Sequence, residues 1–265
     1  MSATIYKYAT AEVGALILKN LTLKATRPDE FNDPFEFTPR MSEQFDMARL
    51  HGLYQHAEEA ARFSETPAPA NFKETLQAVM ANPQILHLIA PDYAAMCRNL
   101  VKTYSSKVAG NTGVICFSRR RDRILMWTHY ADQHKGIVIG FDSSHFPKLF
   151  DVKYDKERVL VDPFTQHIPG SESEENYVYK LITTKHEDWS YEEECRQLHK
   201  LPERAVNEGV HNVPFPAESI VSIAVGMRYA GTGIAEVLSS RGLQLQLERA
   251  VPHPHEFTVA FESFK

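Results

Sequence analysis

The chain has 265 residues, of which 43% are hydrophobic and 24% charged, and its formal net charge is −5 at pH 7. These values are typical of a globular protein that buries a sizeable core in one large domain or two small ones. The slightly negative charge excludes a strong global attraction to nucleic acid or to an anionic membrane, although a local basic groove stays compatible with it.

The cysteines and the N-terminal residues indicate a cytoplasmic protein. Cys97, Cys116 and Cys195 lie far apart and form no CxxC pair, which argues against a zinc ribbon or a disulfide framework. The first residues lack the basic start and apolar core of a signal peptide, and no apolar run is long enough to cross a bilayer. We therefore expect no membrane partner.

The first forty residues predict two short strands around a helix. Aromatic and β-branched residues alternate over 4–10 and predict a strand. Apolar residues at helical spacing over 10–20 predict a helix, with Thr10 as its N-cap. A second strand is expected at 21–28, and a turn at 29–37.

Residues from about 42 to 108 differ from their surroundings, because their apolar residues recur at helical spacing. Their strand neighbours on either side would lack partners without each other, so this region predicts a helical insert and not a separate domain. We expect a single α+β domain over residues 1–265, with the helical insert at about 42–108. The helices expected inside it are 47–63, 72–80, 83–89 and 92–108.

After Gly113 the pattern returns to strands, with helices predicted at 174–186 and 233–242. This order predicts an α+β fold with a mostly antiparallel sheet, either continuous or split. The expected strands are 113–118, 136–142, 150–155, 158–162, 193–200, 219–227, 243–248 and 257–264.

A dense group of rings and cations precedes the strand at 136–142. Residues 123–134 predict a short helix that Gly136 ends, with His134 and Lys135 in its last turn, where cations cap the negative end of the helix dipole. Trp127, His129 and Tyr130 occupy more than one face of this helix. At least one of them should therefore border a cleft or solvent.

Two segments allow both a binding and a structural interpretation. Ser118 ends a strand before RRRDR (119–123), whose arginines could hold a phosphate-bearing ligand or form a solvated loop. In FNDPFE, Asn32 and Asp33 could point into a site, or Asp33 could form an Asx turn with nearby backbone.

The segment WSYEEECRQ predicts a strand with Glu192, Glu194 and Arg196 on one face. On a strand, the two carboxylates would lie about 7 Å apart. One could position a substrate hydroxyl while the other stabilises developing charge, or both could face solvent with Arg196 balancing Glu194. The histidines match no HExxH or facial pattern, so no metal is expected, and no P-loop, GxGxxG or GxSxG motif is present.

Four stretches in this order, IYKYAT, FNDPFEF, CFSRRRDRILMWTHYADQHKGIVIGFD and WSYEEECRQ, resemble a widespread bacterial family described as a domain of unknown function. The layout is more distantly similar to the ADP-ribosyltransferase superfamily, whose split-sheet fold grips NAD with three strand motifs. This second resemblance implies that NAD is the substrate and that no metal is required.

The resemblance to ADP-ribosyltransferases also implies roles for particular residues. Lys7 stands where that superfamily has a histidine or arginine, which departs from its pattern. Ser118 would be the strand residue of the second motif, and Tyr130 or Trp127 would stack on nicotinamide. Glu194 would be the catalytic glutamate and Glu192 its partner. Binding of NAD would further involve Asn32, His129 and Arg196.

The function expected from the resemblance is cleavage of the nicotinamide–ribose bond of NAD, with possible transfer of ADP-ribose to an unknown protein or nucleic-acid acceptor. A toxin or phage-defence effector would use such an activity. Two alternatives stay open. One is a nuclease-like enzyme that uses Lys7, His129, Lys135 and Glu194; the other is a non-catalytic module that binds a nucleotide or a peptide.

Overall fold

The computed structural model describes residues 3–41, 47, 51, 72–82, 84, 95, 98–99, 102, 105–106, 109–161, 178–202 and 209–264. The chain divides into two compact units. Unit 1 comprises Met1–Thr26, Gly113–Tyr154 and Glu187–Lys265, and unit 2 comprises Arg27–Thr112 and Asp155–His186.

The predicted helical insert falls largely outside the described residues. Its described part contains α4 (Phe72–Ala81), which agrees with the helix predicted at 72–80. Most residues of the helices predicted at 47–63, 83–89 and 92–108 lie outside the described residues, and so does Cys97. The single domain with an insert at about 42–108 therefore stays a prediction.

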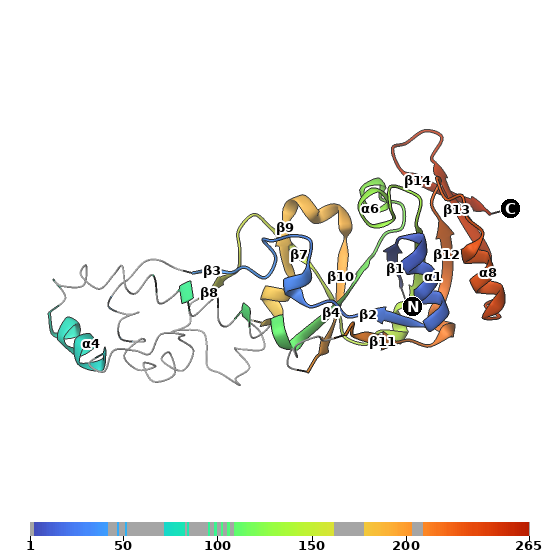
Figure 1. Ribbon diagram of the computed structural model, residues 1–265. Helices are drawn as coiled ribbons and strands as arrows, with labels where there is room; N and C mark the ends of the chain where they lie inside the picture. The colour runs from blue at the N-terminus through green and yellow to red at the C-terminus, as the bar shows by residue number, and fades with distance from the viewer. Residues whose placement is uncertain are drawn as a thin grey trace. The chain divides into compact units, whose positions relative to one another are not determined.

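An eight-stranded sheet forms the centre of unit 1 and confirms the predicted α+β fold with a mostly antiparallel sheet (Figure 1). Among the registers described within this sheet, the pairing of β12 with β13 is parallel and the others are antiparallel. The strands, in spatial order, are β14 (Val259–Ser263), β13 (Leu247–Pro252), β12 (Ile220–Val225), β5 (Ile137–Asp142), β1 (Thr4–Ala9), β4 (Thr112–Ser118), β10 (Glu194–Lys200) and β6 (Leu149–Asp151).

The sheet is continuous, with a narrow junction between β1 and β4. β1 pairs with β5 along all its residues, from Thr4 opposite Asp142 to Ala9 opposite Ile137. Towards β4, the described register consists of Tyr6 opposite Ser118. The strands that carry Lys7, Ser118 and Glu194 are consequently neighbours, in the order β1, β4, β10.

Two helices, α1 (Ala11–Asn20) and α8 (Gly233–Ser240), lie side by side and cover one face of this sheet (Figure 1). Thr10 is the N-cap of α1, as predicted, and its side chain accepts a hydrogen bond from the Val13 N–H. Gly14 allows α1 to approach β5 closely, because a Cβ atom there would lie 2.2 Å from Ile137 Cδ1.

The opposite face is covered by the short helix α6 (Ile124–Tyr130). Its Trp127 is completely buried and packs edge-on against Tyr8 of β1, with ring centroids 5.6 Å apart. Met126 joins the same apolar cluster as Val138 of β5. The helix is thus fixed over the middle of the sheet by its buried side.

The predicted end of this helix was wrong. α6 ends at Tyr130, and Asp132, Gln133 and His134 follow with φ angles of 44°, 53° and 69°. This left-handed turn contacts the segment that follows β12, because the His134 carbonyl accepts a hydrogen bond from Arg228 N at 2.9 Å. His134 and Lys135 are therefore not in the last turn of a helix, and they do not cap it.

Two further boundaries differ from the sequence-based expectation. The helix predicted at 174–186 gives way to strand β9 (Thr184–His186). The strand predicted at 243–248 begins only at Leu247, where pairing with β12 starts opposite Ile223. In the second case the alternating leucines fit a strand locally, but the register with β12 sets where pairing begins.

The remaining elements are short. β11 (Asn212–Pro214) pairs with β2 (Thr22–Lys24) in unit 1, and β3 (Arg40–Met41) pairs with β8 (Leu160–Val161) in unit 2. The others are β7 (Lys153–Asp155) and the 3₁₀ turns η1 (Pro28–Glu30), η3 (Ser143–His145), η4 (Glu187–Glu192) and η5 (Ala217–Ser219). Within the described residues, no helix is long and apolar enough to cross a membrane.

Unit 2 contains a buried ion pair that joins its two chain segments. Lys185 Nζ lies 3.0 Å from Glu36 Oε1, and each side chain is 3% exposed. Nearby in sequence, the Asp33 carboxylate accepts a hydrogen bond from Phe35 N at 2.9 Å, which is the Asx turn that was one of the two interpretations of FNDPFE. The acidic residues of this motif thus have structural contacts.

Candidate functional site

The two glutamates of the predicted catalytic pair flank a sharp corner in unit 1. Glu192 is the last residue of η4, Glu193 has a left-handed φ of 41°, and Glu194 begins β10. The prediction that WSYEEECRQ (189–197) forms one continuous strand was therefore wrong. The geometric basis for a 7 Å separation of the carboxylates along a strand is lost, although Glu194 and Arg196 do alternate along β10 as predicted.

Glu194 forms a buried, bidentate ion pair with Arg196. Arg196 Nε and Nη2 lie 2.8 and 2.9 Å from the two carboxylate oxygens, and the two residues are 6% and 1% exposed. The alternative interpretation is confirmed in that Arg196 balances Glu194, but it is wrong about the solvent-facing position, because both groups are inside the protein. A pair of this geometry compensates for the loss of hydration of both charges.

Cys116 and Lys7 lie beside this pair on the neighbouring strands. Burial, together with the Glu194 carboxylate to which the thiol hydrogen-bonds, raises the pKa of Cys116 well above its ordinary range. The charges of Arg196 and Lys7 act in the opposite direction. Lys7 Nζ donates to the Cys116 carbonyl at 2.9 Å. Side chains from β1, β4 and β10 therefore form one polar cluster, with an uncharged thiol at neutral pH.

Glu192 lies on the side of the corner that faces α6. Its carboxylate accepts a hydrogen bond from the Tyr130 hydroxyl at 2.6 Å, and the residue is 3% exposed. The Ser118 hydroxyl donates to the Glu192 carbonyl at 2.6 Å, and it accepts from Arg120 N at 3.0 Å. Tyr130 and Ser118, two of the residues predicted for the site, are thus in direct contact with Glu192.

The other two rings of α6 have different surroundings. Trp127 is fully buried, and its Nε1–H donates to the Arg121 carbonyl at 2.7 Å. It has no face that a ligand could stack on, so of the two residues predicted to stack only the half-buried Tyr130 stays a candidate. His129 is exposed, 6.4 Å from Tyr130 between ring centroids, which confirms that one ring of this group borders solvent.

The basic loop 119–123 is engaged by carboxylates of unit 1. Arg119 pairs with Asp151 at 2.7 Å, and Arg121 pairs with Glu248 at 2.5 Å and stacks on Phe261. Of the two interpretations of this loop, the structure favours the structural one. The partners of Arg119 and Arg121 come from distant parts of the sequence, so the sequence pattern could not reveal them.

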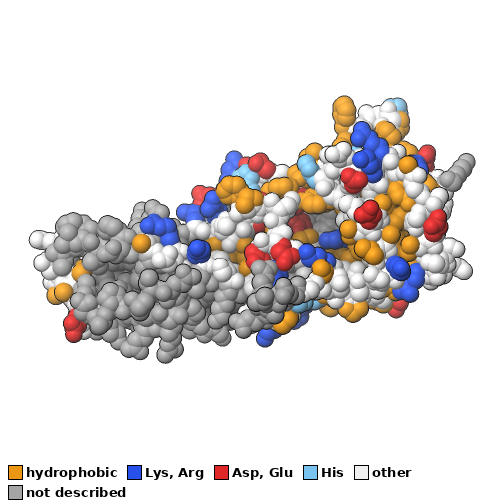
Figure 2. All heavy atoms as spheres, in the orientation of Figure 1, with side chains coloured by type: hydrophobic (Ala, Val, Ile, Leu, Met, Phe, Trp, Pro, Cys, Tyr) orange, Lys and Arg blue, Asp and Glu red, His pale blue; other side chains and the backbone are white. Residues whose placement is uncertain are grey.

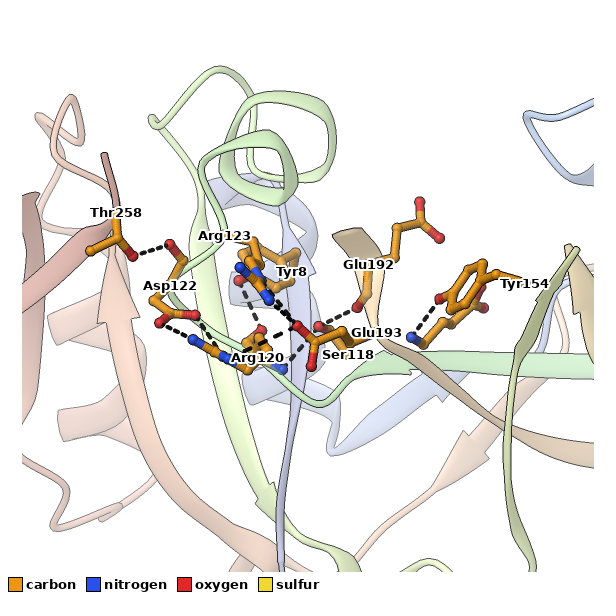
Figure 3. Close-up of polar contacts among 10 residues, drawn as sticks. Tyr8, Ser118, Arg120, Asp122, Arg123, Tyr154, Glu192, Glu193 and Thr258 are labelled. Atoms are coloured by element: carbon orange, nitrogen blue, oxygen red, sulfur yellow. Dashed lines mark hydrogen bonds and ion pairs between the residues drawn. The ribbon is translucent and has the colours of Figure 1, made fainter. Parts of the chain in front are cut away.

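The second half of the loop holds the corner itself. Arg123 forms an ion pair with Glu193, through Nε at 3.0 Å and through Nη2 (Figure 3). Arg120 forms a bidentate pair with Asp122 at 2.9 and 2.7 Å and lies 3.9 Å from Glu193. The guanidinium of Arg120 lowers the pKa of Asp122, so the pair is charged at neutral pH.

The structure brings most of the predicted residues together in unit 1. The contacts described above form two sets, which the backbone of the corner at Glu193 joins: Lys7, Glu194 and Arg196 in one, and Ser118, Tyr130 and Glu192 in the other. Trp127 lies in the apolar core and His129 at the surface. Asn32 is exposed and belongs to unit 2, apart from this set.

Sequence reasoning missed three residues of the site. Cys116 carries the thiol beside Glu194, Glu193 is the left-handed residue of the corner, and the Tyr154 hydroxyl accepts a hydrogen bond from Glu194 N at 2.8 Å. Cys116 could have been found, because it alternates with Ser118 on β4. Tyr154 carries no local signal, since it is distant in sequence and its contact is with backbone.

The site offers carboxylates, one arginine and aromatic hydroxyls. Among the residues that the structure describes, no three His, Cys, Asp or Glu side chains gather in a way that could hold a metal ion. Figure 2 shows acidic and basic side chains intermixed over the face in view. The chemistry available is therefore stabilisation of positive charge by a carboxylate next to a tyrosine ring.

Comparison with known proteins gives one finding. Residues 126–197 match the model of a family described as a protein of unknown function (DUF2971), and no curated protein and no solved structure matches. The matched stretch includes Tyr130, Glu192, Glu194 and Arg196, whereas Lys7 and the FNDPFE motif precede it. The chain is thus similar to this family over residues 126–197.

Proposed function

We propose that this protein is an ADP-ribosyltransferase-like enzyme that cleaves the nicotinamide–ribose bond of NAD and transfers ADP-ribose to a macromolecular acceptor. The observation that carries the proposal is the Tyr130–Glu192 hydrogen bond of 2.6 Å, two residues before the buried Glu194–Arg196 pair. It joins an aromatic ring to one carboxylate, and the second carboxylate, Glu194, follows two residues later in the chain. A ring and carboxylates are the groups that this cleavage requires.

The chemistry follows from the charge that develops on the sugar. Breaking the bond to nicotinamide leaves positive charge on the ribose, which a fixed carboxylate stabilises. Glu194 is the carboxylate proposed to do this, with Glu192 as its partner. Tyr130 would hold the leaving base by stacking, because a flat aromatic ring favours offset contact with another.

The contacts of the basic loop favour this function over a nuclease. A nuclease would need the RRRDR arginines for phosphate, yet Arg119, Arg121 and Arg123 are paired with Asp151, Glu248 and Glu193. Likewise, His129 and Lys135 are exposed, whereas Glu192 and Glu194 are buried.

The experiment measures nicotinamide release from NAD by the full chain and by variants that keep its melting temperature. Glu194→Gln and Glu192→Gln should each lower turnover at least a hundredfold, since the removal of a preorganised charge-stabilising group costs about this much. Glu248→Gln is the matched control, because it removes a carboxylate of another ion pair and should leave turnover intact.

Different results would support the alternatives. Degradation of RNA or DNA that is lost in Lys135→Ala would establish the nuclease instead. If NAD raises the melting temperature but the wild-type chain does not turn NAD over, whichever acceptor is offered, the protein is a binding module. No release and no thermal shift at millimolar NAD would refute the proposal.

A further inference from the structure

The corner Glu192–Glu193–Glu194 is held by the loop 119–123 through several kinds of contact. Arg119 N donates to the Glu193 carbonyl at 2.8 Å, and the Ser118 hydroxyl donates to the Glu192 carbonyl at 2.6 Å. Arg123 pairs with the Glu193 carboxylate (Figure 3). Backbone and side chain of the corner are thus both fixed by one loop.

Glu193 needs such support, because its backbone conformation is unfavourable. Its φ of 41° lies in the left-handed region, which side chains with a Cβ atom avoid. Strained residues of this kind persist only where surrounding contacts hold them, and they cluster at functional sites. A relaxation at Glu193 would rotate the peptide groups on either side and move Glu192 and Glu194 relative to each other.

We propose that Arg123 and Glu193 are positioning residues, whose ion pair keeps the Glu192 and Glu194 carboxylates in their mutual arrangement. Neither residue touches the substrate in this proposal. Its consequence for catalysis rests on the proposed function, whereas the claim about the corner does not. The sequence suggests the basic loop 119–123 as a phosphate site. In this proposal its Arg123 binds a carboxylate of the protein itself.

The ion pair suits a local role. The side chains of Arg123 and Glu193 are 42% and 35% exposed, and pairs at this exposure contribute little to global stability. Removing the pair should leave the fold intact while the corner relaxes. Arg121 belongs to the same loop but pairs with Glu248, at 2.5 Å, and not with a residue of the corner. It therefore supplies a matched control.

The test combines amide hydrogen exchange of the full chain with NAD turnover. Arg123→Gln and Glu193→Gln should each speed exchange of the Glu194 amide at least tenfold, and the double variant should add little. The charge reversal Arg123→Glu with Glu193→Arg should restore protection. Arg121→Gln should not change it. Glu193→Gly relieves the strained φ but removes the carboxylate. If the Glu194 amide exchanges as fast in this variant as in Glu193→Gln, loss of the ion pair is the cause of the faster exchange.

The two readouts separate this inference from the proposed function. If the corner loosens in both single variants and turnover falls through kcat with KM nearly constant, positioning is supported. If the corner loosens while the wild type releases no nicotinamide, the ion pair does hold the corner and the proposed function fails. If exchange at Glu194 is unchanged in both single variants, at an unchanged melting temperature, the ion pair does not hold the corner. Undiminished kcat despite a loosened corner overturns its positioning role.

Discussion

At the scale of single residues, the site consists of charges that are buried with partners. Glu194 is paired with Arg196, and Glu192 accepts a hydrogen bond from Tyr130. Burying a carboxylate without such a partner costs several kcal/mol, about the whole stability of some domains. The residues that form these contacts are therefore the first candidates for substitution.

Tyr130→Phe removes the hydrogen bond to Glu192 and keeps the ring. A bond to a charged group contributes about 1.5–3 kcal/mol, so the free energy of unfolding should fall by this order while the ring can still stack on a ligand. Urea unfolding measures the change. In a double-mutant cycle with Glu192→Gln, the two effects should be strongly non-additive; simple additivity would mean that the bond carries no stability.

His134 predicts a dependence of stability on pH. Burial and the charge of Arg228 lower its pKa, and its Nδ1 has no hydrogen-bond partner in the described part of the chain. The unfolded chain therefore takes up the proton at higher pH than the folded chain does. The contribution of His134 to stability is complete above about pH 6.5, the ordinary value, and is lost as the pH falls through the lowered pKa.

His134→Gln should consequently flatten the decline in stability that begins as the pH falls below about 6.5. Part of the dependence of stability on pH should remain in this variant, because burial also lowers the pKa of His199. His129→Gln changes an exposed histidine and serves as the control. Equal slopes in the wild type and in His134→Gln, measured by urea unfolding at a series of pH values, would contradict the assignment.

At the scale of elements, the strands and helices with clear periodicity were predictable. The helix after Thr10 and strands such as β5 and β12 follow from local spacing of apolar residues, which tertiary contacts reinforce. The end of α6 was not predictable, because three consecutive left-handed residues are held by contacts with residues 226–228. Gly226 is required there, since a Cβ atom would lie 2.0 Å from the His134 carbonyl oxygen.

Gln133→Gly tests the strain in this turn. Gln133 is exposed and has a φ of 53°, so glycine should remove a cost of about 1 kcal/mol and raise the melting temperature. Lys19→Gly, at an exposed position of α1, is the control and should destabilise by about the same amount. Destabilisation by both changes would show that the Gln133 side chain outweighs the backbone strain.

The candidate site was predictable only as a set of residue types. Glu192, Glu194, Ser118 and Tyr130 could be singled out from motifs, and Ser118 and Tyr130 do contact Glu192. Their arrangement could not be predicted, because it depends on the corner at Glu193 and on ion pairs between distant residues. Arg121 and Glu248, for example, are 127 positions apart, and no local pattern relates them.

At the scale of the whole molecule, the chain forms two units, each assembled from segments that are separate in sequence. In unit 2, the buried pair of Glu36 and Lys185, 3.0 Å apart, connects the two segments, as the pairing of β3 with β8 also does. The glutamate of the FNDPFE motif thus has a structural role at this scale.

Glu36→Ala should destabilise unit 2 by about 3–5 kcal/mol, since it leaves the Lys185 ammonium buried without its ion-pair partner. The double change Glu36→Leu with Lys185→Met should recover most of the loss, because it leaves no buried charge. Hydrogen exchange should accelerate in peptides from 27–41 and 178–186 and stay slow in 137–142. Equal acceleration in all of these peptides would mean that the two units unfold together.

The most direct test of the central claim is nicotinamide release from NAD by the wild-type chain and by Glu194→Gln, both shown to be folded by near-UV circular dichroism. We predict steady release by the wild type and a loss of at least a hundredfold in the variant, as expected for a charge-stabilising carboxylate. Intact NAD after long incubation with the folded wild-type chain and candidate acceptors, or equal release by both proteins, would contradict it.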